Sequence, residues 1–293
     1  MSLPPGAAPR SSQVASYLQV APLFLVLLFF VGLPLTVVVV VSFWNYDDLG
    51  LYPAFTLQNY IDVLTSETTW RLYYETLKNA FLTWLLTLLI GFTVSYFLVF
   101  HVRNILWQIA LFLVCTVPFW TSNIIRMISW IPFLGRNGIF NQLLMGAGIT
   151  SRPLEFLLFS DFAVILSYVH LFTLFMLVPI FNSMARIDPA LIEAAYDAGA
   201  KPWQVVWEVV VPLCRTGIAL GSIFVVALVM GDFFAIRVLS GGQSGSVTSA
   251  MSNQIANLSY PLAAANAVVL IVIVILMVGA ILRVVDVRKE LAS

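Results

Sequence analysis

The sequence predicts an all-α, polytopic membrane protein whose six transmembrane helices form one bundle. Its 293 residues are 61% hydrophobic and only 10% charged, with a mean hydropathy of +0.98, whereas about 25% of the residues of a soluble domain are charged. Several apolar runs reach the roughly 20 residues that a helix needs to cross a bilayer. The net charge of zero gives no support for nucleic-acid binding. Cys115 and Cys214 lie in or beside apolar runs without metal-ligand spacing, so we interpret both as small core residues.

A polar segment separates the first two predicted spans. Residues 1–17 are expected to be a short tail, and the first span covers roughly residues 18–43. This apolar run is too long for the core of a signal peptide, so we expect it to be retained as a span. In the polar segment 45–76, Thr56 is placed to cap a short helix. The second span covers roughly residues 77–100.

Turn residues lie between the third and fourth predicted spans. The third span covers roughly residues 105–130 and the fourth roughly residues 159–184. Gly135 and the pair Asn137-Gly138 are turn formers, so the chain must leave the helix there. We expect an outer loop between these turns and the fourth span.

Charges and helix signals interrupt the apolar pattern at residues 186–212, which we call the elbow loop. Asp188 precedes a proline, a favourable helix start. Gly199 can adopt the left-handed conformation that ends a helix. The proline at position 202 can then open a second helix, which Pro212 is expected to interrupt. Apolar residues recur at i, i+3, i+4 and i+7 in the first helix, at Leu191, Ala194, Ala195 and Ala198. The elbow loop is therefore predicted to be two short amphipathic helices joined at a glycine.

The fifth and sixth spans complete one transmembrane domain over residues 18–285. They cover roughly residues 213–236 and 261–285, and residues 286–293 form a C-terminal tail. The glycine-rich stretch 241–246 lacks the lysine of a phosphate-binding loop, so we interpret it as a turn. Basic residues cluster at the short loops on the side of the two termini, which favours cytoplasmic termini and a cytoplasmic elbow loop.

The elbow loop resembles the EAA loop of the permease subunits of bacterial ABC importers. The resemblance lies in Glu193-Ala194-Ala195, in Gly199 and in the Val-Val-Pro that ends at Pro212. An interfacial helix pair with two amphipathic stripes is the alternative interpretation. The resemblance implies the type I permease fold and a cytoplasmic coupling element seated on the ATPase. The implied ATPase-coupling residues are Glu193, Ala194, Ala195, Asp197, Gly199 and Pro212.

Two further segments carry the resemblance: the first is common in these permeases, and the second is typical of their spermidine/putrescine branch. Phe-Thr-Leu-Gln-Asn-Tyr at 55–60 resembles a segment found just outside the first span. Leu-Gly-Arg-Asn-Gly at 134–138, with Asn141 after it, resembles the segment that follows the third span in that branch. The resemblance implies a polyamine cargo, while related permeases carry amino acids, opines, iron or sulfate. A secondary carrier would show inverted repeats, which we do not find, and a scaffold would not need acids at membrane depth.

We expect no catalytic residue, no metal site and no cofactor bound by this chain. The sequence shows no nucleophile–base set, zinc-ligand spacing or nucleotide-binding loop. The resemblance implies that ATP and Mg²⁺ are held by a partner ATPase dimer. It also implies a second homologous permease subunit, an extracytoplasmic solute-binding protein and a location in the bacterial cytoplasmic (inner) membrane, surrounded by lipid.

Acids at membrane depth indicate where a cation could pass, because each costs several kcal/mol unless it faces a cavity or a partner. Asp161 and Asp232 are such acids, and Trp130 and Tyr168 could add cation–π contacts. These four residues are the candidate substrate pathway. The alternatives are that Asp161 caps the fourth span and that Asp232 pairs with an arginine, Arg237 or Arg126.

Overall fold

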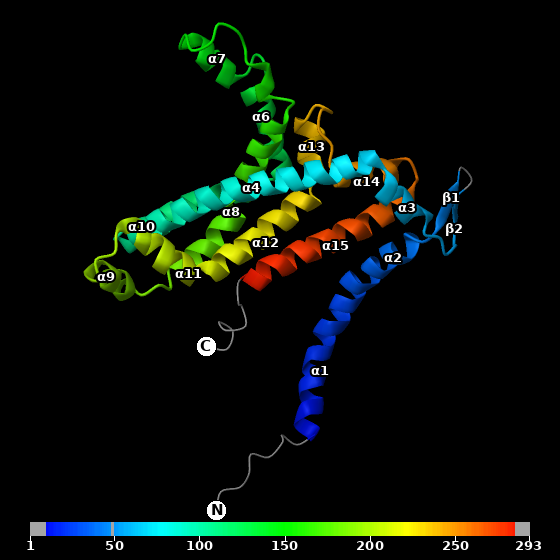
Figure 1. Cartoon of the computed structure of the whole chain (residues 1–293), viewed down its shortest axis with the longest axis horizontal. Helices are drawn as coiled ribbons and strands as arrows, with labels where there is room; N and C mark the ends of the chain where they lie inside the picture. Colours follow the sequence, from blue (N-terminus) through cyan, green and yellow to red (C-terminus); the bar gives the residue numbers. More distant parts are fainter. Residues whose placement is uncertain (1–9, 48–49, 285–293) are drawn as a thin grey trace, which may run out of the picture. The chain divides into compact units, whose positions relative to one another are not determined.

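The computed structural model describes residues 10–47 and 50–284, and this part of the chain is almost entirely helical (Figure 1). It divides into two compact units. One comprises the described residues up to Thr65 together with Gln254–Val268, and the other comprises Ser66–Asn253 together with the described residues from Val269 onward. Among the described residues, four helices are long and apolar enough to cross a membrane, and two bent pairs bring the number to as many as six.

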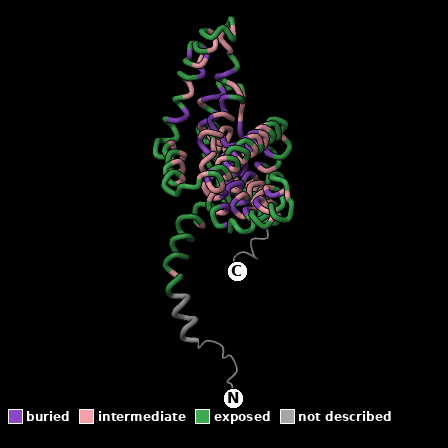
Figure 2. Tube along the Cα trace, turned by 90° about the vertical axis from the view of Figure 1, so that its left-hand side faces the viewer, coloured by how far each residue is buried: buried purple, intermediate pink, exposed green. Residues whose placement is uncertain are grey.

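The first predicted span is one long helical stretch. It consists of α1 (Arg10–Leu27), a π-helical turn η1 (Leu28–Gly32) and α2 (Leu33–Val41). Pro34 has no N–H to donate, and the helix widens to a π turn just before it. Residues 10–17 of the predicted tail are helical and belong to α1, while the candidate membrane span begins after them, at Gln19; residues 1–9 lie outside the described part. The described positions of this helix are mostly exposed (Figure 2).

Two short strands and a short helix follow α2 in the same unit. Strands β1 (Asn45–Asp47) and β2 (Gly50–Tyr52) form an antiparallel hairpin that was not predicted. Thr56 caps α3 (Gln58–Thr65) as predicted, accepting a 3.1 Å hydrogen bond from the Gln58 N–H. Buried Asn59 donates to the Ser42 and Trp44 carbonyls at 3.0 and 2.8 Å. The 55–60 segment therefore satisfies carbonyl groups just beyond the end of α2.

Three helices form the core of the second unit: α4 (Glu67–Phe100), α8 (Asp161–Met184) and α12 (Arg215–Gly231). Ser66 caps α4 through the Thr69 N–H, so this helix starts ten residues earlier than the predicted span. A Cβ at Gly217 would collide with the Pro179 carbonyl, which explains how α12 approaches α8 so closely. Two hydrogen bonds also join these helices, from Trp84 to Ser222 and from Ser95 to Leu177.

The third predicted span is not continuous, which corrects the prediction for residues 105–130. The chain forms α5 (Ile105–Thr116), a 3₁₀ turn η2 (Val117–Trp120), α6 (Asn123–Leu134) and α7 (Ile139–Gly146). The two halves are bent by 89°. Pro118 cannot donate a helical hydrogen bond, and Thr121 is extended with φ −97° and ψ 151°. The turn predicted at Gly135 is confirmed, because α6 ends at the residue before it.

The fifth predicted span is also broken. The second helix of the elbow loop runs as α10 (Pro202–Gln204), η4 (Val205–Val210) and α11 (Val211–Leu213), so it continues through Pro212 and bends by 71° at Cys214. A π turn precedes Pro212 and accommodates its missing N–H. At the other end, α12 stops before Asp232 and α13 (Phe234–Leu239) follows.

The remaining elements are η3 (Glu155–Leu157), α9 (Pro189–Asp197), α14 (Val247–Ala256) and α15 (Tyr260–Val284).

Candidate functional site

The elbow loop lies at one end of the α4–α8–α12 core (Figure 1). Asp188 begins α9 as predicted, its Oδ1 accepting a 2.9 Å hydrogen bond from the Ala190 N–H. Gly199 has a φ of +87°, and the Ala200 N–H donates to the Ala195 carbonyl at 3.0 Å. This is the hydrogen-bond pattern of a glycine-terminated helix. The predicted elbow is therefore confirmed in its start, its stop and its glycine conformation.

The surface of the elbow loop is open and partly aromatic. No residue of α9 or α10 is buried, and Glu193, Ala194, Asp197 and Pro212 are exposed while Ala195 is half-buried. Trp203 and Trp207 lie one turn apart and are 60% and 66% exposed. In the second helix of the elbow loop, Val205 and Val210 are the buried residues, and they pack against the rest of the unit. An exposed aromatic surface on a capped, anchored helix pair is suited to contact with another protein.

A polar cluster lies at the opposite end of the same core, near the start of α8. The Lys78 Nζ lies 2.8 Å from Asp161 Oδ2 and also contacts the carboxylate of Glu75, one turn earlier on α4. The hydroxyl of Ser244 donates to the other oxygen of Asp161. Ser160, not Asp161, caps α8, accepting a 3.3 Å hydrogen bond from the Ala163 N–H. Asp161 thus joins α8 to α4 and to the segment after α13.

Tyr168 and Asp232, two of the four candidate pathway residues, are in contact. The Tyr168 hydroxyl lies 3.2 Å from Asp232 Oδ1, which also accepts a 2.9 Å hydrogen bond from the Ala235 N–H. The Asp232 carbonyl accepts a 2.7 Å hydrogen bond from Thr248. Tyr168 is fully buried. Asp232 forms no ion pair with Arg237 or any other arginine among the described residues, so it fixes the break between α12 and α13 through neutral donors.

Trp130 belongs to a different contact, between α6 and α8. Its ring meets Phe133 and His170 edge-on, with centroids 5.7 and 5.6 Å apart. Arg126, one turn before Trp130, is 7% exposed and donates to Asn123. Trp130, Asp161 and the Tyr168–Asp232 pair therefore make separate contacts.

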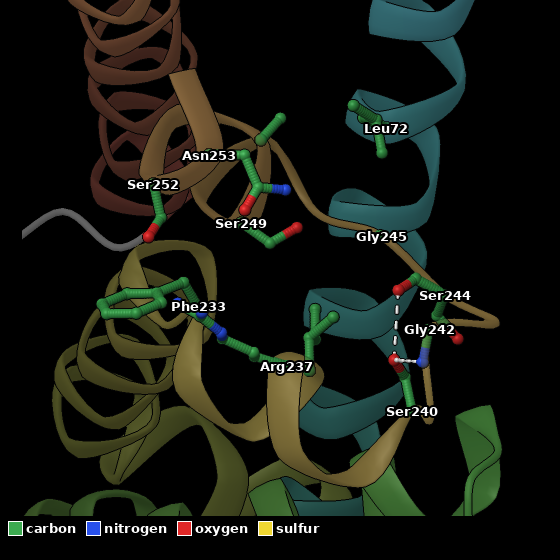
Figure 3. A pocket seen from close by; sticks show the side chains of 12 residues that line it. Leu72, Phe233, Arg237, Ser240, Gly242, Ser244, Gly245, Ser249, Ser252 and Asn253 are labelled. Carbon is green, nitrogen blue, oxygen red and sulfur yellow. Dashed lines mark hydrogen bonds between the residues drawn. The ribbon is translucent and has the colours of Figure 1, made fainter. Parts of the chain in front are cut away.

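Two cavities open beside the polar cluster. One has a volume of about 310 Å³ and is lined by α13, α14, Leu72 and the segment that follows α13 (Figure 3). The second, of about 470 Å³, is lined by Arg71, Glu75, Asp161 and the same segment. Among the described residues, no group of three His, Cys, Asp or Glu side chains is placed to hold a metal.

The sequence did not single out Lys78 or Ser244. Lys78 is a charge within an apolar helix, the signal that identified Asp161 and Asp232, and the same criterion could have found it. Ser244 carries no such signal, because its partner Asp161 lies 83 residues away in the chain.

Comparison with known proteins identifies a family over most of the chain. The model of the family described as "Binding-protein-dependent transport system inner membrane component" matches residues 103–289. The Haemophilus influenzae spermidine/putrescine transport system permease protein PotB is 33% identical over 230 residues, 77% of this chain and 78% of that protein. The Escherichia coli (strain K12) PotB is 31% identical over 260 residues, 86% and 90% of the two chains.

A solved structure shares the fold. It is a chain of a bacterial alginate ABC transporter, crystallised in complex with an alginate pentasaccharide-bound periplasmic protein. The TM-score is 0.73 at 18% sequence identity, and the match covers 92% of this chain and 93% of that chain. At this identity the likeness concerns the fold alone, which is that of an ABC importer permease.

Proposed function

This chain belongs to the family of binding-protein-dependent transport system inner membrane components, and from that premise we infer that it carries a small polycation, a polyamine such as spermidine or putrescine, into the cell. It is a multi-pass permease subunit of an ABC importer. The cargo is supported by the two relatives, which are spermidine/putrescine permeases at 31% and 33% identity over more than three quarters of this chain.

The observation that carries the mechanism is the elbow loop. It presents exposed aromatic side chains on two short, capped helices at one end of the packed core. We propose that this surface docks on an ATPase dimer, which holds ATP and Mg²⁺ and performs the hydrolysis. Because both helices are capped and the second is anchored by buried valines, a movement of the ATPase would be passed to α8 and α12.

The proposed orientation follows from this docking. The elbow loop and both termini face the cytoplasm, where ATP is found, and the polar cluster faces outward. We propose that a solute-binding protein delivers the cargo at that outer end, as the name of the family implies. A second, homologous permease subunit would complete the pathway across the membrane.

We propose that the cation passes the four candidate residues, Trp130, Asp161, Tyr168 and Asp232. Asp232 and Tyr168 offer adjacent oxygen atoms, and Trp130 offers an aromatic face. Asp161 already binds Lys78, so it would meet a cargo ammonium only after that ion pair opens.

Uptake by a reconstituted importer tests the proposal. The permease would be assembled with its ATPase, its second permease and its binding protein in liposomes, and ATP-driven uptake of radiolabelled spermidine and putrescine would be measured. We expect uptake that requires both ATP and the binding protein. ATP-driven uptake of an amino acid, opine, sulfate or iron instead would replace the polyamine, and uptake without ATP would indicate a secondary carrier.

A further inference from the structure

One short segment forms a wall common to both cavities. We call Gly241–Gly245 the wall segment. Gly242, Ser244 and Gly245, together with Leu72 of α4, line the 310 Å³ cavity and the 470 Å³ cavity alike. Beyond the wall, the smaller cavity continues along α13 and α14, and the larger along α4 to Asp161. A displacement of this segment would therefore join the two cavities.

The wall segment is held by a short turn and by one side chain: the Gln243 N–H donates to the Ser240 carbonyl at 3.1 Å, and Gly241 lies against Phe159. Ser240, at its start, accepts a 3.2 Å hydrogen bond from the Gly242 N–H and donates one of 3.2 Å to the Ser244 carbonyl (Figure 3). The Ser244 hydroxyl donates to Asp161. Gly241 and Gly242 have φ values of +60° and +81°, which glycine adopts without strain. Among the described residues, this hydroxyl–carboxylate contact is the side-chain hydrogen bond that joins the wall segment to α8.

Lys78 determines where that carboxylate lies. Its ammonium contacts both Glu75 on its own helix and Asp161 on α8. Asp161 thus accepts from Lys78 with one oxygen and from Ser244 with the other. Arg71 lines the same cavity but forms no ion pair among the described residues. One ammonium therefore links α4, α8 and the wall segment.

We propose that the wall segment is a gate at the outer end of the core and that Lys78 is the positioning residue that keeps it closed. While the Lys78–Asp161 pair is intact, Asp161 holds Ser244 and the two cavities stay separate. When the pair opens, the wall segment leaves α4 and the cavities join. The inference rests on the proposed function, because a gate here matters only if cargo enters at this end.

A reversible cross-link tests whether the wall has to move. A Cβ added at Gly245 would lie 2.5 Å from Leu72 Cδ2, an atom that Leu72→Cys removes. The double variant Leu72→Cys/Gly245→Cys should therefore form a disulfide when oxidised. We expect oxidation to abolish ATP-driven uptake and a reductant to restore it, while each single variant stays insensitive to both. A disulfide that forms without lowering uptake would overturn the gate, and so would failure of the disulfide to form.

A second experiment isolates Lys78. ATP hydrolysis by the assembled transporter would be measured without binding protein, where a closed gate keeps the rate low. We expect Lys78→Met to raise this rate about fivefold, the scale of one partly exposed ion pair, and Lys78→Arg to return it to near the wild-type value. Arg71→Met is the matched control, a cation of the same cavity without an ion pair, and should leave the rate unchanged. An unchanged rate in Lys78→Met would overturn the role of Lys78.

Failure of the proposed function would be recognised separately. In that case the wild-type assembly itself would show no ATP-driven uptake. The gate is contradicted only when the wild type transports and the variants behave like it.

Discussion

At the scale of single residues, Gly199 matters for its backbone and not for the space around it. Its φ is +87°, and a Cβ placed on it would meet nothing within 4 Å. A larger side chain would therefore not collide with the protein, but a β-branched residue would be strained in this conformation. The elbow loop depends on one residue that can turn left-handed.

We expect Gly199→Val to abolish coupling while leaving membrane insertion intact. Strain of about 1–3 kcal/mol would move the two short helices apart, and uptake should fall about tenfold or more. Uptake and ATPase activity of the assembled transporter measure this. Gly199→Asn is the matched control, because asparagine tolerates left-handed backbone, and it should retain most activity. Equal uptake in the valine variant and the wild type would refute the role of the elbow.

A substitution at Asp232 can remove the negative charge of the side chain and keep its hydrogen bonds. Asparagine can accept the same hydrogen bonds from Tyr168 and the Ala235 N–H. We therefore expect Asp232→Asn to keep the wild-type melting temperature and to lower polyamine uptake several-fold, because only the negative charge is lost. Unchanged uptake would remove Asp232 from the candidate route and leave it the structural role of fixing the break after α12.

At the scale of the elements, a single asparagine organises the turn after α6. Asn141 is fully buried; it donates to the Gly135 and Leu154 carbonyls and accepts a 2.8 Å hydrogen bond from the Leu154 N–H. The predicted turn residues provide the bend, and Asn141 ties its far side to the loop before η3.

Asn141→Ala should destabilise the protein by about 2 kcal/mol, because it leaves buried backbone groups unpaired. The melting temperature of the purified permease reports this change. Gln142→Ala is the control, because the side chain of Gln142, next to Asn141 in the chain, is exposed and donates only to the Asn137 carbonyl. A melting temperature as high in Asn141→Ala as in the control would argue against this role.

The exposed tryptophans of the elbow loop are expected to contribute most to ATPase binding. Trp203→Ala and Trp207→Ala should each weaken binding of the ATPase by about 2 kcal/mol, or about thirtyfold. Titration of ATPase onto immobilised permease measures the affinity. Phe162→Ala serves for comparison, because Phe162 is 46% exposed at the opposite end of α8 and should not alter it. Equal losses at all three positions would indicate that the surface is not specific.

The sequence predicted the ends of helices well where a capping side chain or a glycine sets the end. Asp188, Gly199 and Thr56 act on backbone groups within three residues, so spacing alone identifies them. Apolar runs located the spans but not their breaks. A hydrophobic run looks the same whether straight or bent, so the 89° bend near Pro118 was missed. The start of α4 at Glu67 was missed because its first turns are polar.

The candidate site was predicted less completely than the fold, because its contacts join residues far apart in the chain. Asp161 and Tyr168 were predicted because they are polar groups at membrane depth. That criterion does not predict which residues they contact. Lys78 and Ser244 each lie 83 residues from Asp161, and only the packing of α4, α8 and α13 brings them there.

At the scale of the whole molecule, the elbow loop and the wall segment lie at opposite ends of the same packed unit. α8 runs from Asp161 in the polar cluster to the start of the elbow loop, and α12 returns from the elbow loop to the break at Asp232. Buried side chains and two interhelical hydrogen bonds hold these helices to α4. Because a close-packed core is hardly compressible, a displacement of the helices at one end also displaces them at the other end.

Photo-cross-linking from Glu193 tests the central claim most directly, namely that the elbow loop is the contact with the ATPase. Glu193 would be replaced by a photoreactive phenylalanine analogue in the assembled transporter, with Phe162 replaced in the same way at the opposite end. We predict that position 193 cross-links to the ATPase subunit and that position 162 does not. Cross-links from position 193 to lipid alone, or to the solute-binding protein, would contradict the account.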